Sequence, residues 1–161
     1  MSTTSALLGL LAVFLLTAGT GYFVAQEFAY VSADRLALSR QAEAGDRKAA
    51  RALKVLERLS FMLSGAQLGI TVTGLVVGFI AEPSVSALLK PALTGMGIPE
   101  GAVGGISVVL AFVLATVVQM VLGELAPKNL AIAVPERLAK ALAPSTLGYL
   151  KVVGPLVHVF D

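Results

Sequence analysis

The 161-residue chain is 57% hydrophobic and only 14% charged, and its mean hydropathy of +0.87 lies outside the range of soluble globular domains. With no cysteine and one histidine, it excludes disulfide frameworks, thiolate metal sites and His-rich metal clusters. The net charge of +2 does not indicate a nucleic-acid partner, because the basic residues lie beside apolar segments, so we expect one all-α membrane domain over residues 1–161, with the lipid bilayer as a partner.

The first apolar segment covers about residues 6–31, which as a helix would extend about 39 Å and cross a membrane with some tilt. A cleaved signal peptide is the alternative. However, no basic residue precedes the segment, and no clear small-residue cleavage site follows it. We therefore predict an uncleaved transmembrane helix.

Residues 34–60 are rich in arginine and lysine and predict a helical hairpin at the membrane surface. Gly45-Asp46 is typical of one helix end followed by the N-cap of the next helix. From Ala49 to Leu56, apolar residues recur at helical spacing. The basic residues indicate either attraction to anionic lipid or another domain, or a solvated cytoplasmic loop, and the second interpretation is favoured.

A second span is predicted at about residues 61–81, ending at Glu82-Pro83, and a third at about residues 104–126. With three spans, every lysine and arginine except Lys90 lies on the side of the hairpin and the C-terminus. The positive-inside rule makes that side cytoplasmic. We therefore expect a multi-pass plasma-membrane protein with its N-terminus outside and its C-terminus in the cytoplasm.

The last segment, about residues 137–160, is apolar but is interrupted by residues such as Pro144 and Pro155. Interrupted segments persist at membrane depth only when they are packed in protein or lie at the interface. We predict a bent juxtamembrane helix along the cytoplasmic surface. The stop at Asp161, just after an apolar segment, is consistent with a longer chain.

The most informative motif is Gly123-Glu124-Leu125-Ala126-Pro127-Lys128, at the end of the third span. A carboxylate near membrane depth is costly without a partner, so it marks an ion path, a coupling site or a structural ion pair. Pro127 has no N–H to donate to the carbonyl of Gly123, four residues earlier. The motif therefore offers a carboxylate and a carbonyl oxygen side by side, which are ligands that hard cations prefer.

The second span carries a polar and small-residue face. Helical spacing places Gln67, Thr71, Gly74 and Gly78 on one side of the helix, with Thr73 beside them. This face is either a seam between packed helices or the wall of an ion path. The spacing alone leaves both interpretations open.

Polar residues also occur in the other two spans. Gln26-Glu27 ends the first span, where Glu27 either neutralises Arg35 or Lys128 or binds an ion. Neutralisation is slightly favoured, because charge costs little near the headgroups. Gln119 lies one helical turn before the Gly-Glu motif. Polar oxygens from three helices predict a shared site for a hard cation, such as Mg²⁺, Ca²⁺, Na⁺ or Mn²⁺.

Together these motifs resemble the transmembrane domain of the CNNM/CorC family of magnesium transporters. The runs that carry the resemblance are Glu27-Phe28-Ala29, residues 67–71, Glu82-Pro83, residues 123–128 and Pro135-Glu136-Arg137. The resemblance covers essentially the whole chain in the same order, and the Gly-Glu-x-x-Pro-Lys run is its most specific part. It implies Mg²⁺ efflux coupled to Na⁺ entry, a homodimer, and a cytoplasmic CBS-pair domain in a full-length chain.

The resemblance implies Mg²⁺ as the bound ion, with Na⁺ as a second candidate. The metal ligands that we expect are the Glu124 carboxylate, the Gly123 carbonyl, Thr71, Gly69 and Gln26. The other polar residues that we expect on the path or in coupling are Glu27, Gln67, Thr73, Gln119 and Lys128.

This chain departs from the family at two places. Many members have a serine a few residues before the glutamate of the first span, where this chain has Val24–Gln26. Many members also have asparagine in the second span, where Ile70, Thr71 and Gly74 stand here. Either Gln26, Thr71 or water molecules supply the missing oxygens, or this branch of the family handles the ion differently.

The predicted function is Mg²⁺ export driven by the Na⁺ gradient. The alternative is a non-transporting, magnesium-sensing membrane scaffold that regulates another transporter and in which Glu124 pairs with Lys128 or with neighbours of Glu27. An enzyme is not expected, because the sequence shows no nucleophile–base pair and no phosphate-binding loop.

Overall fold

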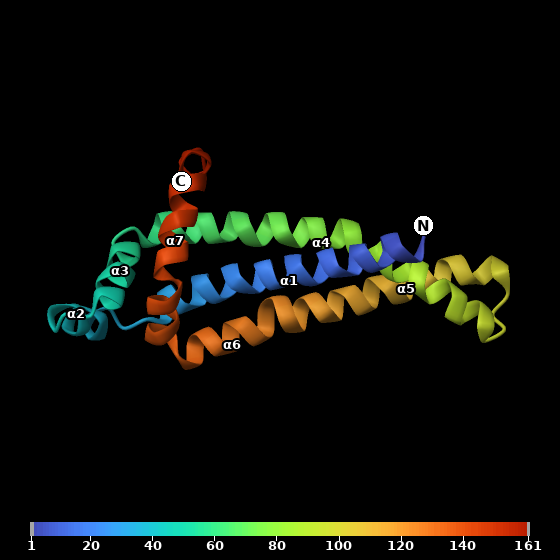
Figure 1. Ribbon diagram of the computed structural model, residues 1–161, viewed down its shortest axis with the longest axis horizontal. Helices are drawn as coiled ribbons and strands as arrows, with labels where there is room; N and C mark the ends of the chain where they lie inside the picture. Colours follow the sequence, from blue (N-terminus) through green and yellow to red (C-terminus); the bar gives the residue numbers. More distant parts are fainter. Residues whose placement is uncertain (1, 161) are drawn as a thin grey trace.

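In the computed structural model, which describes residues 2–160, every regular element is helical. Helix α1 spans Thr3–Ser32, α4 spans Leu59–Gly95, and a third rod over Glu100–Ala133 is formed by α5, η1 and α6. These three helices are long and apolar enough to cross a membrane. They lie side by side along the long axis of the molecule (Figure 1). The prediction of an all-α protein with three spans is confirmed.

A helical hairpin joins the first two spans, as predicted. It consists of α2 (Arg35–Glu43) and α3 (Arg47–Leu56). Gly45, between them, has a φ of 98°, which L-residues rarely adopt and glycine adopts freely. Asp34 caps α2, and Asp46 caps α3 by accepting hydrogen bonds from Lys48 N and Ala49 N at 2.9 and 3.2 Å. Which side of the membrane holds the hairpin stays a prediction.

Helix α7 (Pro135–Val157) crosses the end of the bundle next to the hairpin instead of running parallel to the long helices (Figure 1). Its position agrees with the predicted juxtamembrane helix. The hydroxyl of Tyr30 in α1 donates to the carbonyl of Ala139 at 2.8 Å, and the hydroxyl of Tyr149 in α7 donates to the carbonyl of Gly65 at 2.8 Å. Two tyrosines therefore attach α7 to both α1 and α4.

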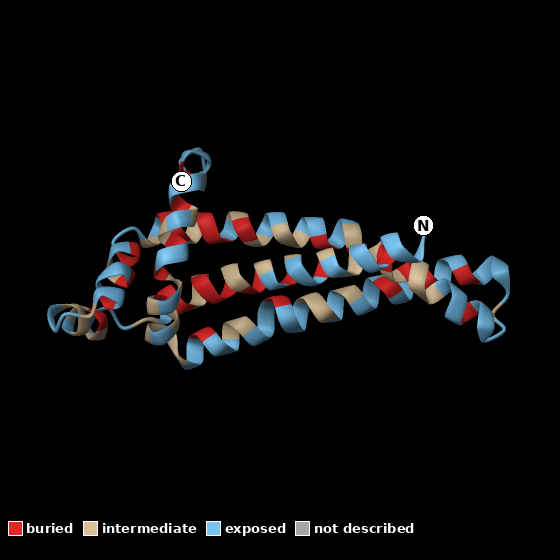
Figure 2. Ribbon diagram, in the orientation of Figure 1, coloured by how far each residue is buried: buried red, intermediate tan, exposed pale blue. Residues whose placement is uncertain are grey.

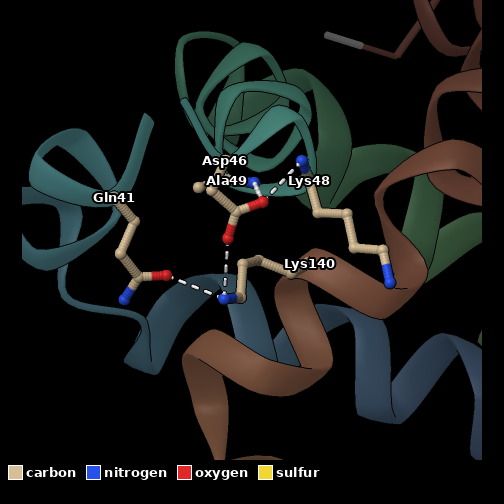
Figure 3. Close-up of polar contacts among 5 residues, drawn as sticks. All are labelled: Gln41, Asp46, Lys48, Ala49 and Lys140. Carbon is tan, nitrogen blue, oxygen red and sulfur yellow. Dashed lines mark hydrogen bonds and ion pairs between the residues drawn. The ribbon is translucent and has the colours of Figure 1, made fainter. Parts of the chain in front are cut away.

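Lys140 of α7 also holds the hairpin in place (Figure 3). Its ammonium group donates to Gln41 Oε1 at 2.7 Å and to Asp46 Oδ2 at 3.1 Å. Within residues 2–160, this contact with Asp46 is the only ion pair. The hydrogen bond from Lys140, aided by the backbone N–H of Ala49, lowers the pKa of Asp46 below its ordinary value.

Helix α4 does not end at Glu82-Pro83, where the sequence placed the end of the second span. It continues through Pro83 and Pro91 to Gly95. Packing explains the continuation: Ser84 lies against Gly9 of α1, and Ser86 Oγ donates to Ser107 Oγ of α5 at 3.0 Å. These tertiary contacts stabilise the helix more than the missing N–H groups of the prolines destabilise it.

Burial is concentrated where the hairpin and α7 meet α1 and α4. The main buried cluster there includes Tyr30, Leu38 and Met62, which are fully buried. Exposed residues follow the outer faces of all three long helices (Figure 2). Many of them are large and apolar, such as Phe79 at 83% exposure, which suits helices surrounded by lipid.

Candidate functional site: a π-helical turn, a polar seam and a hollow

The third rod changes its hydrogen-bonding pattern at the Gly-Glu motif. Between α5 (Glu100–Val118) and α6 (Ala126–Ala133), the π-helical segment η1 covers Gln119–Leu125. The N–H of Ala126 bonds to the carbonyl of Val121, five residues earlier. Pro127 favours this local change, because it has no N–H for the carbonyl of Gly123. Such π turns are rare and frequently occur at functional sites.

Helix α1 approaches the backbone of η1 closely at Gly21. A Cβ atom on Gly21 would lie 3.2 Å from the carbonyl oxygen of Leu122, 3.8 Å from that of Gly123 and 3.4 Å from Pro127 Cγ. Glycine at this position lets the two backbones come together. As a result, the carbonyl oxygens of the π turn lie beside α1 instead of facing lipid.

Four polar side chains connect the three long helices, and we call Thr17, Thr20, Thr73 and Gln119 the polar seam. Thr17 Oγ1 donates to Gln119 Oε1 at 2.9 Å, and Gln119 Nε2 donates to Thr20 Oγ1 at 3.1 Å. The hydroxyls of Thr20 and Thr73 are 2.8 Å apart and share a hydrogen bond. The seam therefore fixes the first residue of η1 against α1, and Thr20 in turn joins α1 to α4.

Beside the seam, α4 and the third rod enclose a hollow of about 400 Å³, which we call the first hollow. Its polar lining comes from Glu82 of α4, from Thr116 of α5, and from Gln119 and Glu124 of η1. Gly74 and Gly78 form part of the wall on α4, and a Cβ atom on either one would meet nothing within 4 Å. The glycines therefore leave space in front of Glu124.

The lining of the first hollow suits a hard cation. It offers carboxylate, amide and hydroxyl oxygens. Residues 2–160 contain no group of three or more His, Cys, Asp or Glu side chains placed to hold a metal ion. A cation here would therefore draw on amide, hydroxyl, backbone and water oxygens in addition to carboxylate, as Mg²⁺ commonly does.

Three of the predicted residues come together at the π turn. Glu124 and Gln119 line the first hollow, and Gly123 is buried, with the Gln119 amide 3.1 Å from where its Cβ would stand. Thr73 belongs to the seam and also donates to the carbonyl of Gly69 at 2.8 Å. The carbonyl of Gly69 therefore already accepts a hydrogen bond from the polar seam.

The remaining predicted residues lie elsewhere. Thr71 and Gln67 line another hollow, together with Ser60 and Phe160, so Thr71 does not share the first hollow with Glu124. The part of α4 that lines the first hollow begins at Gly74, about one helical turn beyond Thr71.

Gln67 contributes instead to a contact between α4 and α1, because its Nε2 donates to Glu27 Oε1 at 2.8 Å. Gln26 is fully buried, and its Nε2 donates to Thr146 of α7 at 2.9 Å. Lys128 stacks on the ring of Phe28 at 4.7 Å. These residues connect helices, and their roles as ligands stay predictions.

Sequence reasoning missed two threonines and one carboxylate. Thr17 and Thr20 are buried in α1 and complete the polar seam. Their signal was present, because two hydroxyls three residues apart on one face interrupt an apolar helix. Glu82 was interpreted as the end of a span and as part of the family resemblance but not as a site residue, whereas it lines the first hollow.

Comparison with known proteins gives consistent matches along the chain. A family model described as the Cyclin M transmembrane N-terminal domain (CNNM) matches residues 10–161. UPF0053 protein MT1890 of Mycobacterium tuberculosis is 37% identical over 159 residues, which cover 99% of this chain and 35% of that protein. UPF0053 protein YugS of Bacillus subtilis is 36% identical over 155 residues, 96% of this chain and 36% of that protein. The chain thus spans about a third of the length of these relatives.

Proposed function

The chain belongs to the CNNM family, and we propose that it exports Mg²⁺ across the membrane in exchange for Na⁺. The family is linked to divalent-cation transport. The three long apolar helices and the family together make the chain a multi-pass membrane protein. The activity of the much longer relatives is carried over here as a proposal only.

The observation that supports the proposal most is the position of Glu124. Its carboxylate borders a hollow whose other polar lining residues are Glu82, Thr116 and Gln119, directly after the buried Gly123 on a π-helical turn. In this proposal Glu124 is the central ligand of the ion, and the Gly123 carbonyl and water complete the shell. A small hard cation such as Mg²⁺ prefers this oxygen set.

The polar seam has a positioning role in the proposal. Gln119 accepts one hydrogen bond and donates another to α1, so the start of η1 is held against α1 while Glu124, five residues later, faces the hollow. Na⁺ competes for the same oxygens, because it is also a hard cation. Exchange then follows from alternating occupation of one site by the two ions.

We further propose a plasma-membrane location with the hairpin and α7 in the cytoplasm. The support is the positive-inside rule, since only Lys90 among the lysines and arginines lies toward the other end. A homodimer is proposed because the resemblance to the family implies one. A CBS-pair domain is proposed for a full-length chain, because its relatives extend far beyond the matched region.

Flux measurements on the purified protein in proteoliposomes test the proposal. Wild-type vesicles loaded with Mg²⁺ are expected to lose it when Na⁺ is supplied on the opposite side. Glu124→Gln keeps the shape but removes the charge, and we expect about a hundredfold slower flux. The matched control is Glu43→Gln, because Glu43 is exposed at the end of α2, away from the hollow.

Two outcomes would contradict the proposal at different levels. Wild-type flux in Glu124→Gln would remove Glu124 from the site while leaving transport in place. No flux by the wild type under any gradient of Mg²⁺ or Na⁺ would favour the magnesium-sensing scaffold.

A further inference from the structure

Glu82 borders two hollows that follow one another in the groove between α4 and α5. One is the first hollow, which Glu124 also lines. The second hollow, of about 320 Å³, is lined by Glu82, Ser86, Lys90 and Val108. One carboxylate therefore belongs to both spaces, and the two hollows lead from the π turn toward the loop that joins α4 to α5.

The depth of Glu82 in the membrane follows from contacts between α1 and the segments around Glu82 and the π turn. Gly9 of α1 lies against Ser84 of α4, whereas Gly21 lies against Leu122 in the π turn. Ser84 lies at the level of Gly9, and Glu82 is two residues closer than Ser84 to the level of Gly21. About ten residues of α1, or about 15 Å along the helix, therefore separate Glu82 from the π turn. Both levels lie within the apolar run of α1, so Glu82 is a second carboxylate at membrane depth.

Glu82 has no basic partner in the part of the chain that the structure describes. The one ion pair within residues 2–160 joins Lys140 to Asp46 at the opposite end of the molecule. Glu82 is half-buried, and a carboxylate at this depth is costly without a partner. Pro83 adds polarity, because it has no N–H for the carbonyl of Phe79. A carboxylate followed by a helical proline thus occurs at both ends of the first hollow, with the proline one residue after Glu82 and three residues after Glu124.

We infer that Glu82 forms an outer binding site for a hydrated divalent cation. This inference rests on the proposed transport function, with the ion leaving from Glu124 through the two hollows. Six water molecules occupy about 180 Å³ at liquid density, which fits within the first hollow of about 400 Å³. Mg²⁺ gives up its water reluctantly and commonly binds through one or two carboxylates while keeping several waters. Glu82 therefore holds the ion without dehydrating it.

Lys90 gives the outer site a way to release its ion. It shares the second hollow with Glu82, on the side toward the α4–α5 loop. Its positive charge repels a cation held at Glu82 and keeps the affinity low. The inference therefore predicts opposite effects for the two residues. Removing the charge of Glu82 weakens binding from the outside, whereas removing the charge of Lys90 strengthens it.

The test measures inhibition of Mg²⁺ efflux by external Mg²⁺ in proteoliposomes, because an ion that occupies the outer site blocks the exit. For Glu82→Gln, the external Mg²⁺ concentration that halves the efflux is expected to rise about tenfold. For Lys90→Gln, it is expected to fall about threefold. The matched control is Glu100→Gln, an exposed acid in the first turn of α5, which should leave this concentration unchanged.

A second variant separates loss of the site from loss of the fold. Glu82→Asp keeps the charge and should restore most of the wild-type inhibition. If Glu82→Gln leaves the half-inhibiting concentration unchanged while Glu124→Gln stops the efflux, the outer site is refuted and the transport function stands.

If the wild type transports nothing, equilibrium binding of Mn²⁺, a paramagnetic hard cation, decides the inference without flux. Loss of one bound Mn²⁺ in Glu82→Gln, with binding retained in Glu100→Gln, supports the outer site even though the transport proposal has failed. Unchanged Mn²⁺ binding in Glu82→Gln refutes the site.

Discussion

The two ends of this molecule differ in how they are held together. At the hairpin end, α2, α3 and α7 pack on α1 and α4 around a large buried cluster that includes Leu38 and Met62. Toward the α4–α5 loop, the buried cluster among residues 2–160 is small and consists of Val13, Val77 and Ala81. Close packing resists rearrangement, and regions with few buried contacts open at lower cost. We therefore call the hairpin end, with α2, α3 and α7, the base and expect it to be rigid, and we expect movement at the loop end.

Polar contacts follow the same division. The base is fastened by Tyr30, Tyr149 and Lys140, each of which bonds to another element. Toward the loop, Ser86 and Ser107 form a hydrogen bond between α4 and α5. Both hollows bordered by Glu82 lie in this less tightly packed half. Ion binding and release are thus assigned to the part of the fold that is least constrained by packing.

The largest effect should come from weakening the base. Leu38→Ala leaves a cavity in the buried cluster at the hairpin end, and we expect it to cost about 3 kcal/mol of unfolding free energy. Val13→Ala removes less volume from the small cluster on the other side and should cost about 1 kcal/mol. Denaturant unfolding of the purified protein in micelles measures both. Equal losses would show that the two halves are equally well packed.

The next effect concerns the contact between α1 and the π turn. Gly21→Val places methyl groups against the carbonyl of Leu122, and overpacking of this kind costs about 2 kcal/mol. Gly19→Ala is the matched control, because its Cβ would lie 3.5 Å from Thr73, an ordinary contact. We expect a slower Mg²⁺ flux and lower thermal stability for Gly21→Val only. Normal flux in this variant would mean that the close approach has no role in the site.

A smaller effect is expected for the polar seam. Gln119→Leu removes the two hydrogen bonds to Thr17 and Thr20, and hydrogen bonds between membrane helices are worth about 0.6 kcal/mol each. Ser107→Ala removes the hydrogen bond that Ser86 donates toward the loop and serves as the comparison. Thermal unfolding in detergent should rank Gln119→Leu as more destabilising. The reverse order would place the stronger polar contact at the loop end.

The smallest effect should be the pH dependence of the base. Asp46 has a lowered pKa because Lys140 and the α3 N-terminus stabilise its charged form. The unfolded chain then binds the proton more readily, so this stabilisation is present above the unfolded pKa of about 3.9 and is lost as the pH falls through the lowered native pKa.

Asp46→Asn should flatten this part of the acid-unfolding curve, whereas Asp34→Asn, at the other hairpin cap, serves as the control. Hairpin melting recorded between about pH 6 and pH 2, across the window in which the stabilisation is lost, checks this expectation. An unaltered curve for Asp46→Asn would assign the acid sensitivity to other groups.

The sequence alone determined the three long apolar helices, the hairpin and the Gly-Glu motif, because these features depend on neighbouring residues. Hydropathy over some twenty residues predicts a span, and Gly45-Asp46 marks a turn by backbone freedom and capping. Pro127 indicated an altered hydrogen-bonding pattern at Gly123, where the structure has a π turn. Each of these inferences needed only local chemistry.

Only the tertiary structure decided which faces meet. The packing of α4 on the third rod places Gly74, and not Thr71, in the hollow with Glu124. It also carries α4 past Pro83 and leaves Glu82 between two hollows. These outcomes depend on the rotation and depth of one helix against another. Those quantities are set by contacts between residues far apart in the sequence, such as Thr20 with Thr73.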